Sequence, residues 1–523
     1  MSSLSLRNNP YVLTGLSLAL LYGAAKVVKS GLSSRRRAPY PPGPKGYPII
    51  NNLLEIPTPS EHPWLVYEEM AKKYGDMIFL RAFSQPILIL GSAKRMNDLF
   101  EKRSSTHSGR PYSIMLDQLM DWCKAFSLMD YTPRWRKQRK MFHQNFNPTM
   151  IPQYHPIIRR HVQKYLGQTV ASPGEHKSHI RHLIGGIILH ITYGYEPKPT
   201  GDPYIAIAHE VEGAFKIVAV PGTFLVDNIP ILKYVPAWMP GAGFQRFAAY
   251  YKKADYLAKS MPYQFVLDAM KRNEAEPCAV TRLLEDLPSP KDPRYAEDEE
   301  DILNVAGVSY LAGTDTTTGV MTTFTLLMVL YPDVQRKAQA ELDRVVGTGR
   351  LPDFGDRDEL VYVKAVITEL LRWYQATPMA VPHTTSEDNY YDGHFIPKGT
   401  IVMGNAWAVL HDPEVFENPM EFNPERYIKD GKFNTELLDP LSFAFGFGRR
   451  ICPGMHLVKD VVYLMVASTL AMFEIHPSKD ESGAPRNVEL TFESGVVVLP
   501  GPFDSDIRLR SSAAEHLMRG LSE

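Results

Sequence analysis

The stretch that decides the fold of this chain is FAFGFGRRICPGMH, residues 443–456. It places Cys452, one of only 3 cysteines in 523 residues, behind two glycines and two arginines. A proline and Gly454 follow directly, which predicts a loop that feeds the first turn of a helix. A thiol at a helix N-terminus beside arginines is expected to have a lowered pKa, which favours the thiolate. A thiolate is a nucleophile or a metal ligand, and His456 is the base that a nucleophile would use.

The composition is that of an ordinary globular protein. Apolar residues make up 44% and charged residues 22%, and the net charge of −1 gives no reason to expect nucleic acid as a partner. Three cysteines (Cys123, Cys278 and Cys452) are too few for a disulfide framework. They favour a reducing, cytosol-facing environment.

The N-terminus carries an apolar segment. Residues 11–25 have no charge, and with Val27 and Val28 the run is long enough to cross a thin bilayer as a helix of roughly 27 Å. Lysines and arginines follow the run, which predicts a single membrane anchor with the remainder of the chain in the cytosol. A signal peptide cleaved near Ala24 and Ala25 is the alternative.

Hydrophobic patterning predicts a mainly α fold with a small β region. A helix is expected over 302–331, where Asp315 is the only charge, with the acidic run 297–301 at its N-terminus. Its threonines and its charge favour burial in protein over a second membrane span. The other expected helices are 64–73, 332–346, 358–375 and 453–473. The expected strands are 77–82, 86–90, 389–391, 395–396, 400–403, 488–490 and 496–499.

The spacing Phe445-x-x-Gly448-x-Arg450-x-Cys452-x-Gly454 resembles the haem-binding signature of the cytochrome P450 family. The resemblance implies that Cys452 is the proximal iron ligand and that Phe445 packs beside its sulfur. It implies that Gly448 permits a tight turn and that Gly454 lets the next helix start close to the porphyrin. Arg450 would pair with a haem propionate.

Two further motifs support the resemblance. Glu369 and Arg372 form an E-x-x-R pair, which by itself is more often a solvated surface pair. Together with Arg426 in FNPERY it resembles the family's buried ion triad, a structural element that holds the cysteine loop. Trp135-x-x-x-Arg139 resembles the motif that bonds a propionate, and His383 falls where the family places a partner for the other propionate.

The run AGTDTT, residues 312–317, lies inside the long uncharged segment. Taken alone, it fits a closely packed helix whose threonines bond back to carbonyls. By the resemblance it crosses the distal face of the haem, where Gly313 opens the helix for O₂ and the pair Asp315 and Thr316 delivers protons. Related fungal sequences usually have glycine at the position of Thr132, so the resemblance does not determine the geometry of the turn there.

The resemblance covers about residues 40–505, and the local sequence around its motifs is most similar to that of fungal microsomal members. It implies a P450 fold with an N-terminal transmembrane helix in the endoplasmic reticulum and a cytosolic catalytic domain. The expected divisions are an anchor (1–30), a basic, proline-rich linker (31–48), the catalytic domain (49–505) and a tail (506–523).

The implied cofactor is heme b with Cys452 as axial ligand. Electrons would come from NADPH through a separate flavin enzyme, NADPH-cytochrome P450 reductase, with cytochrome b5 as an optional second donor. The chain carries no dinucleotide or flavin motif of its own. Basic residues on the proximal side, Arg449, Arg450 and Lys459, are expected to meet that reductase.

The implied reaction is insertion of one oxygen of O₂ into a small lipophilic substrate. By the resemblance, the pocket is lined by Tyr112, Ala306, Tyr310, Gly313, Met379, Val381 and Val496. Fungal secondary metabolism is expected, with a terpenoid preferred narrowly over a polyketide, aromatic or alkaloid substrate. A reductase-independent haem-thiolate isomerase or peroxygenase is one alternative, and a membrane-tethered hydrolase, for which no G-x-S-x-G motif is present, is another.

Three histidines at steps of three, His176, His179 and His182, raise the question of a metal site. On a helix such steps fan over roughly 120°, which converges poorly on one ion. A metal site there is therefore not expected.

Overall fold

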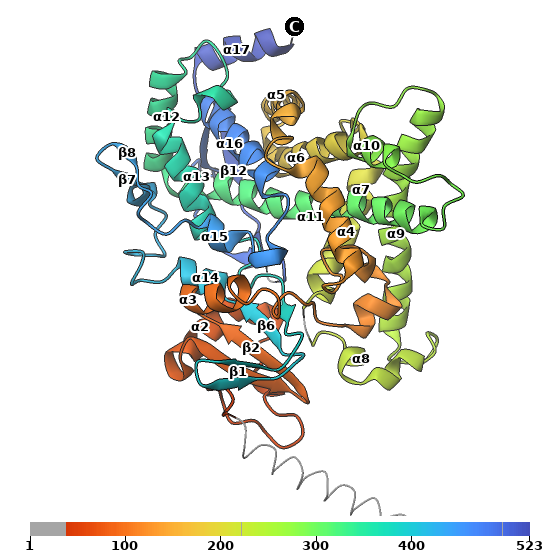
Figure 1. Cartoon of the computed structure of the whole chain (residues 1–523). Helices are drawn as coiled ribbons and strands as arrows, with labels where there is room; N and C mark the ends of the chain where they lie inside the picture. The colour runs from red at the N-terminus through yellow and green to blue at the C-terminus, as the bar shows by residue number, and fades with distance from the viewer. Residues whose placement is uncertain (1–37, 221, 494, 523) are drawn as a thin grey trace, which may run out of the picture.

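The computed structural model describes residues 38–220, 222–493 and 495–522. The expected anchor and the first part of the linker, residues 31–37, lie outside these ranges. Helices dominate the described part and strands form only small sheets (Figure 1). The predicted mainly α fold with a small β region is confirmed.

The largest sheet has the strand order β1-β2-β6-β3. β1 (Met77–Ala82) and β2 (Gln85–Leu90) form an antiparallel hairpin, β6 (Ile401–Gly404) runs parallel to β2, and β3 (His383–Thr384) completes the sheet. Helix α2 (Pro63–Tyr74) packs against β1. The first three strands were predicted, whereas β3 was not, because two residues are too short to show an alternating pattern.

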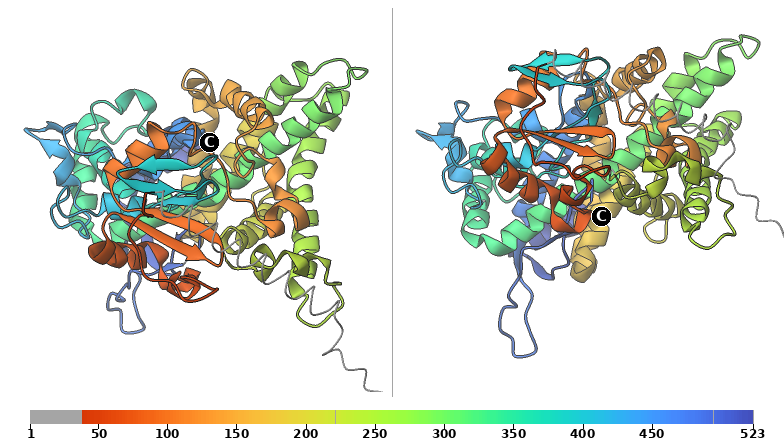
Figure 2. Two further views of the ribbon diagram at one scale, coloured as in Figure 1. Left: turned by 60° about the horizontal axis from the view of Figure 1, so that its bottom comes forward. Right: turned by 90° about the horizontal axis from the view of Figure 1, so that it is seen from below.

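The central element is α11 (Tyr295–Leu330), which crosses the middle of the molecule (Figure 1). It packs against α4 (Pro133–Phe146), α6 (His176–Tyr193), α7 (Pro203–Val218) and α9 (Gly243–Lys271). Its side chains are buried over most of its length, which confirms the predicted buried helix. The sheet lies to the left of α9 in both views of Figure 2.

The acidic run at the start of α11 is tied into the fold. Asp301 is fully buried, and its carboxylate accepts hydrogen bonds from Arg134 Nε at 2.7 Å and Gln138 Nε2 at 2.8 Å. These contacts join the first turns of α11 to α4. The acidic residues also complement the partial positive charge of the helix N-terminus.

The remaining helices surround α11 or the sheet. They are α3 (Ala93–Met96), α5 (His155–Ala171), α8 (Leu225–Asn228), α10 (Ala279–Glu285), α12 (Pro332–Val345), α13 (Val361–Trp373), α14 (Ala406–Leu410), α15 (Leu441–Ala444), α16 (Met455–Met472) and α17 (Ser512–Ser522). The remaining strands are β4 (Asn389–Tyr391), β5 (His394–Ile396), β7 (Ile428–Lys429), β8 (Lys432–Phe433), β9 (Phe473–Pro477), β10 (Phe492–Glu493), β11 (Leu499–Pro500) and β12 (Ser505–Leu509).

The C-terminal part differs from the prediction. Residues 488–490 form no strand, and of the strand expected over 496–499 only Leu499 lies in one, β11, which pairs with β10. The segment expected as a tail after residue 505 contributes β12, which pairs with β9, and α17, which contacts α5. Ala514 and Met518 of α17 are buried in the main core. The last residues therefore share the core of the helical region.

Within the described ranges, one helix is long and apolar enough to cross a membrane, namely α16. It is mostly buried and packs against α5, α12 and α13. It is therefore a core helix of this fold. The predicted anchor, residues 1–30, falls outside the part of the chain that the structure describes.

Candidate active site

The cysteine loop connects α15 to α16 and turns sharply twice. Gly446 and Gly448 both have positive φ, +74° and +53°. A Cβ atom on Gly448 would lie 2.2 Å from the carbonyl oxygen of Phe100, so only glycine fits there. The amide of Gly448 donates to Glu101 Oε1 at 2.6 Å, and the amide of Cys452 donates to the Phe445 carbonyl at 2.7 Å.

The pKa of Cys452 contradicts the expected lowering. Burial raises the pKa of this thiol, although the backbone amides of Gly454 and Met455 and the charge of Arg139 act in the opposite direction. The two arginines next to it in sequence do not stabilise a thiolate, because Arg449 bonds to the Tyr131 hydroxyl and Arg450 to backbone carbonyls. A metal ion bound to this sulfur would hold it as a thiolate, because a coordinating thiol is deprotonated outright.

Arg450 is buried and bonds to three backbone carbonyls. Its Nε donates to Ser108 O at 2.8 Å, its Nη1 to Phe126 O at 3.0 Å and its Nη2 to Met129 O at 2.8 Å. Burial lowers its pKa to about 10. Because the side chain is buried, Arg450 is not on the surface that a redox partner would meet, which corrects that part of the expectation.

Arg110 is a second guanidinium near the cysteine loop, half-buried, and sequence reasoning missed it. It donates to the carbonyls of Val381 at 2.9 Å, Pro382 at 2.7 Å and Ser127 at 3.1 Å. Burial and the charge of Arg450 both lower its pKa. The one sequence signal for this role is weak, namely the place of Arg110 between a glycine and a proline.

The two members of the Trp135/Arg139 pair point to backbone groups. Trp135 Nε1 donates to the Phe126 carbonyl at 3.0 Å, and Arg139 Nη2 donates to the Ile451 carbonyl at 2.6 Å, beside Cys452. Thr132, where the turn geometry was open, caps α4 by accepting from the Trp135 amide at 3.1 Å. His383 is buried, with Nδ1 2.6 Å from the His107 carbonyl.

These cations lack anionic partners. Arg110, Arg139 and Arg450 form no ion pair with any carboxylate among the described residues, and burial lowers the pKa of each. Unpaired buried charge is costly, whereas charge-assisted bonds to a carboxylate are strong. A cofactor that carries two carboxylates, as haem does, therefore fits this arrangement around Cys452.

The middle of α11 has one accessible stretch. Ala312 is exposed and Thr316 is half-buried, although most residues on either side are buried. They are four residues apart and share one face of the helix. Thr316 Oγ1 donates to the Ala312 carbonyl at 3.0 Å. A Cβ atom on Gly313 would lie 2.7 Å from Ile188 Cδ1, so this glycine admits a side chain of α6.

Asp315 is buried and paired with two cations. Arg181 Nη2 on α6 donates to its Oδ1 at 2.7 Å, and Lys216 Nζ on α7 lies 3.0 Å from its Oδ2. Burial acts to raise the pKa of Asp315, but Lys216 and Arg181 outweigh it and hold the pKa below its ordinary value. Arg181 also bonds to Glu212, a second buried carboxyl group that sequence reasoning missed.

The residues expected to line a substrate pocket differ in how far they are buried. Ala306 and Tyr310 are buried in the core, and the Tyr310 hydroxyl donates to the Tyr204 carbonyl at 3.1 Å. Tyr112 is exposed and bonds to Gln118. Met379, Val381 and Val496 are half-buried. Tyr310 and Tyr112 therefore do not present hydroxyl groups to a common interior space, which corrects their expected role as polar handles.

The E-x-x-R pair is fully buried and joined by Arg426. Arg372 donates to Glu369 through Nε at 2.7 Å and Nη2 at 2.9 Å, and Arg426 Nε donates to Glu369 Oε1 at 3.1 Å. Arg372 also bonds to the Leu410 carbonyl at 2.8 Å, and the Asn423 amide donates to Glu369 at 2.9 Å. The triad ties α13 to the segment before α15.

The histidines of α6 do not form a common ligand set. Ring nitrogens of His176, His179 and His182 contact Thr325, Ser172 and Lys198, three different partners.

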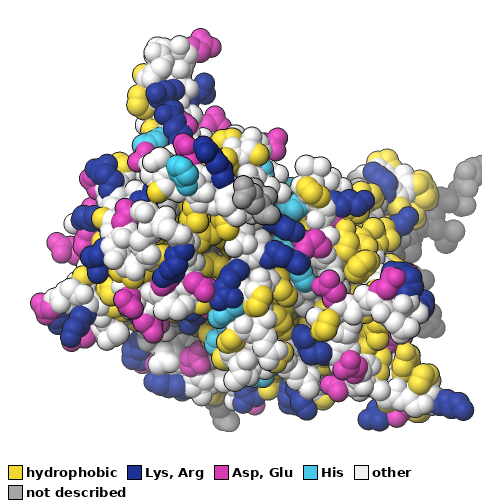
Figure 3. Space-filling model, turned by 90° about the horizontal axis from the view of Figure 1, so that it is seen from above, with side chains coloured by type: hydrophobic (Ala, Val, Ile, Leu, Met, Phe, Trp, Pro, Cys, Tyr) yellow, Lys and Arg dark blue, Asp and Glu magenta, His cyan; other side chains and the backbone are white. Residues whose placement is uncertain are grey.

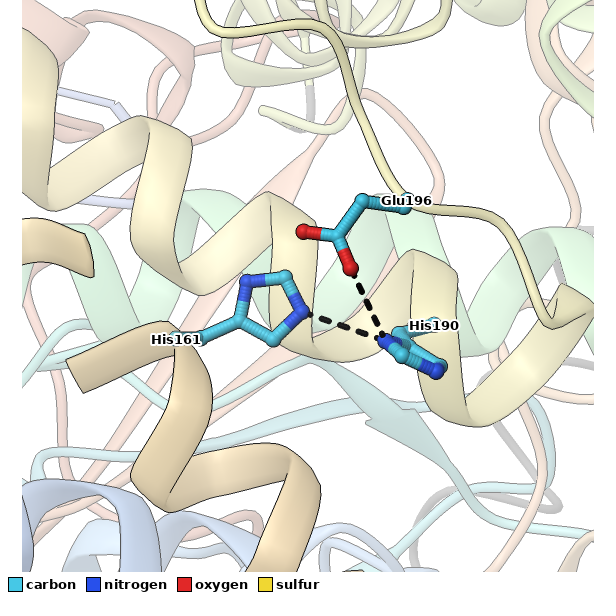
Figure 4. A group of neighbouring side chains, drawn as sticks. All are labelled: His161, His190 and Glu196. Atoms are coloured by element: carbon cyan, nitrogen blue, oxygen red, sulfur yellow. Dashed lines mark hydrogen bonds and ion pairs between the residues drawn. The ribbon is translucent and has the colours of Figure 1, made fainter. Parts of the chain in front are cut away.

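A second group, His161, His190 and Glu196, does lie together (Figure 4). Arg160 Nη2 is 2.9 Å from His190 Nδ1 and also contacts Glu196, so a cation already sits between these ligands. The group is a hydrogen-bonded cluster between α5 and α6.

A helical fold with a cysteine loop before its core helix, and cations around that cysteine that have no carboxylate partner among the described residues, fits a haem-thiolate protein. A family model described as "Cytochrome P450" matches residues 41–504, and the chain belongs to the cytochrome P450 family. The fungal relatives agree with this assignment. The chain is therefore a monooxygenase whose haem is ligated by a cysteine thiolate, and it depends on O₂, a substrate and a redox partner.

Three relatives illustrate the similarity. The chain is 41% identical over 497 residues to "Cytochrome P450 monooxygenase COX1" of Coprinopsis cinerea, covering 93% of this chain and 95% of that protein. It is 41% identical over 484 residues to "Cytochrome P450 monooxygenase COX2" of the same fungus, with 92% of each chain covered. It is 39% identical over 481 residues to "Cytochrome P450 monooxygenase ple1" of Rhodocybe pseudopiperita, covering 92% and 91%.

Proposed function

We propose that this chain is a membrane-anchored monooxygenase that takes electrons from NADPH-cytochrome P450 reductase and oxidises a small lipophilic metabolite. The observation that carries the proposal is the buried carboxylate of Asp315 next to Thr316, on the accessible stretch of α11. Oxygen insertion consumes protons, so a positioned acid and hydroxyl group are what the reaction requires. A reductase-independent isomerase would not need them.

The residues that would hold heme b are those of the cysteine loop and the unpaired cations. Cys452 would be the axial ligand, Phe445 would pack beside the sulfur, and Gly454 would give the porphyrin room. Arg110, Arg139, Arg450, Trp135 and His383 would face the propionate side. When bound, the thiolate-ligated haem supplies oxygen activation.

The chain's own contribution to the reaction is proton delivery. Thr316 Oγ1 would leave the Ala312 carbonyl and carry a proton on the accessible face of α11. Asp315 would supply that proton once it has been protonated itself. Burial of Asp315 keeps bulk water from replacing its carboxylate.

A basic surface supports docking of an acidic reductase. Arg136 and Lys140 on α4 are exposed, Arg449 is exposed, and Lys459 on α16 is half-buried. Their positive charge would speed encounter with an acidic partner. Elsewhere charge is mixed, and the face shown in Figure 3 carries basic and acidic side chains interspersed. Cytochrome b5, as a second donor, would use the same basic surface.

The membrane proposal has its own support in the exposed apolar side chains around η9 (Pro230–Tyr234). Ile231, Tyr234 and Trp238 are 67%, 70% and 80% exposed. The chain enters the described part beside β1, where the Phe79 amide donates to the Pro42 carbonyl. β1 lies at the lower end of the molecule, and so does α8, the helix directly before η9 in the chain (Figure 1). An anchor and this apolar segment would therefore meet one bilayer. The endoplasmic reticulum is the proposed membrane.

The substrate class follows from the apolar character of the pocket proposed from Met379, Val381 and Val496. We favour a terpenoid in fungal secondary metabolism over a polyketide, aromatic compound or alkaloid. The test is product analysis of microsomes that contain this chain and the reductase, with each substrate class supplied in turn. Oxidised terpenoid that forms only with NADPH supports the proposal, and NADPH-independent conversion would contradict it.

A further inference from the structure

Glu212 on α7 belongs to a charged group that spans three helices. Arg181 of α6 donates through Nη1 to Glu212 Oε2 at 2.9 Å and through Nη2 to Asp315 Oδ1 at 2.7 Å. One guanidinium therefore bridges a carboxyl group of α7 and a carboxyl group of α11. Lys216, also on α7, pairs with the other oxygen of Asp315.

The two carboxyl groups are not equivalent. Asp315 has two cations, whereas Glu212 shares one of them, and its buried Oε1 has no hydrogen-bond partner among the described residues. Burial and the charge of Asp315 raise the pKa of Glu212 to about 8, while the cations keep the pKa of Asp315 low. Near neutral pH, Glu212 carries a proton and Asp315 does not.

An ionised Asp315 has no proton to give to Thr316. Glu212 is the neighbouring carboxyl group that holds one, and ligand-type atoms of His209, Glu212 and Asp315 all lie within 4.8 Å of one another. One water molecule or a small side-chain rotation bridges such a distance. His209 is exposed, so this group reaches from solvent to the buried carboxylate on α11.

We propose that His209, Glu212 and Asp315 form the path by which protons enter from solvent and reach Thr316, with Glu212 as the member that stores the proton. The inference rests on the proposed role of Asp315 and Thr316. In the central step, the Glu212 carboxyl group gives its proton to the Asp315 carboxylate. Arg181 remains bonded to the Glu212 anion, and solvent restores its proton through His209, so charge balances and no electrons move.

The other charged and titratable groups nearby do not compete for this role. Arg181 and Lys216 remain cations that pair with the carboxylates. Tyr310 on α11 uses its hydroxyl proton in the bond to the Tyr204 carbonyl. Asp202 accepts from the Tyr204 and Ile205 amides at the start of α7 and from the Tyr195 hydroxyl. Because the two cations lie at the carboxylates, a proton path fits this group better than a metal ion.

The first test measures the stored proton directly, by infrared spectroscopy of the resting holoenzyme across a pH series. We expect a protonated carboxyl band below pH 7 that disappears as the pH rises through about 8. The band should be absent from Glu212→Gln and present in Glu210→Gln, a matched control in which an exposed carboxyl group of the same helix is changed. A band that persists in Glu212→Gln would overturn the inference.

The second test measures coupling of NADPH use to product. Glutamine has the shape of a neutral glutamate, so a purely structural role predicts no change in Glu212→Gln. We expect instead unchanged haem content and carbon monoxide spectrum with about tenfold less product per NADPH, below the full effect of a positioned acid. Wild-type coupling should fall as the pH rises through about 8, and this transition should be absent from Glu212→Gln.

Separate results would refute the entry path through Glu212 and the proton delivery by Asp315 and Thr316. Wild-type coupling and an unchanged pH profile in Glu212→Gln would overturn the entry path and leave the roles of Asp315 and Thr316 intact. Full coupling in Thr316→Ala would instead refute the proposed proton delivery, whatever the infrared band shows. His209→Gln should slow the return of the Glu212 proton after a pH jump, and an unchanged rate would remove His209 from the path.

Discussion

Arg450 shows how one buried side chain positions the cysteine loop. Its guanidinium bonds to three carbonyls in the segment 108–129 and lies over the ring of Trp135, 4.7 Å from the centroid. These bonds satisfy the guanidinium, but its charge forms no ion pair with a carboxylate in the described part of the chain. The geometry therefore stabilises the loop and at the same time favours an anionic cofactor.

Gly448 and Gly454 give a paired prediction at the residue scale. Gly448→Ala combines positive φ with a 2.2 Å clash, and we expect about 2 kcal/mol or more of lost stability. Gly454→Ala meets no atom closer than Cys452 Sγ at 3.9 Å, so the folded chain should keep its stability. Denaturant unfolding measures both, and equal stability of Gly448→Ala and wild type would contradict the account.

Gly454→Ala also reports on the cofactor. If the porphyrin lies against the start of α16, this variant should fold but bind less haem. Haem content per folded protein measures the effect. Full haem occupancy in Gly454→Ala would show that this glycine does not provide the clearance proposed for it.

Thr316 is the residue for which the prediction concerns chemistry. Thr316→Ala removes a half-buried hydroxyl whose one bond is to the Ala312 carbonyl, so stability should change little. We expect a normal carbon monoxide spectrum, with NADPH consumed and hydrogen peroxide released in place of product. The ratio of peroxide to product measures this outcome, and unchanged product yield would exclude Thr316 from proton delivery.

At the scale of elements, the ion triad joins α13 to the segment that leads into the cysteine loop. Glu369 and Arg372 have no exposed side-chain surface, and Arg426 has 9%. A buried ion network of this kind gains little relative to apolar residues but is costly to break. Its place in the fold explains why a pair that is commonplace on helix surfaces is structural here.

Glu369→Gln tests the triad. The substitution removes the negative charge that pairs with two arginines in a buried site. We expect the free energy of unfolding to fall by about 3–5 kcal/mol, together with lower haem retention. Asp333→Asn, which breaks the exposed pair with Arg336, is the control and should cost less than about 1 kcal/mol. Thermal unfolding compares them, and similar values for both variants would contradict a structural role for the triad.

The apolar segment around η9 gives a prediction at the same scale. Trp238 is 80% exposed, and at a bilayer surface its indole would enter the headgroup region. Its fluorescence in the full chain should therefore be quenched by brominated lipids. Trp238→Phe, the control, should lose that quenched component, and wild-type fluorescence unaffected by brominated lipid would exclude this segment from the membrane.

Local patterns in the sequence predicted much of the molecule. The helix over 302–331, the hairpin of β1 and β2 and the cysteine loop depend on neighbouring residues, and their patterns are therefore visible in sequence. Near the C-terminus, β10 and β11 have only two residues each, too few to show an alternating pattern, whereas β12 pairs with β9 from a separate segment of the chain.

The site was less predictable for the same reason. The pKa shifts of Arg110 and Glu212 come from burial and from partners that are distant in sequence. Glu212 and Asp315 are more than 100 residues apart, and Arg110 and Val381 are more than 200 residues apart. The pKa of Cys452 was misjudged because sequence adjacency suggested that both arginines act on the sulfur, whereas their side chains bond elsewhere. Only the three-dimensional arrangement shows these effects.

At the scale of the whole molecule, the central claim is that the fold presents Cys452 to a haem iron as a thiolate. The carbon monoxide difference spectrum of the reduced full-length protein tests it most directly. We expect the red-shifted Soret band of a thiolate-ligated haem in the wild type and its loss in Cys452→Ser. A folded, haem-loaded wild-type protein without that band would contradict the account.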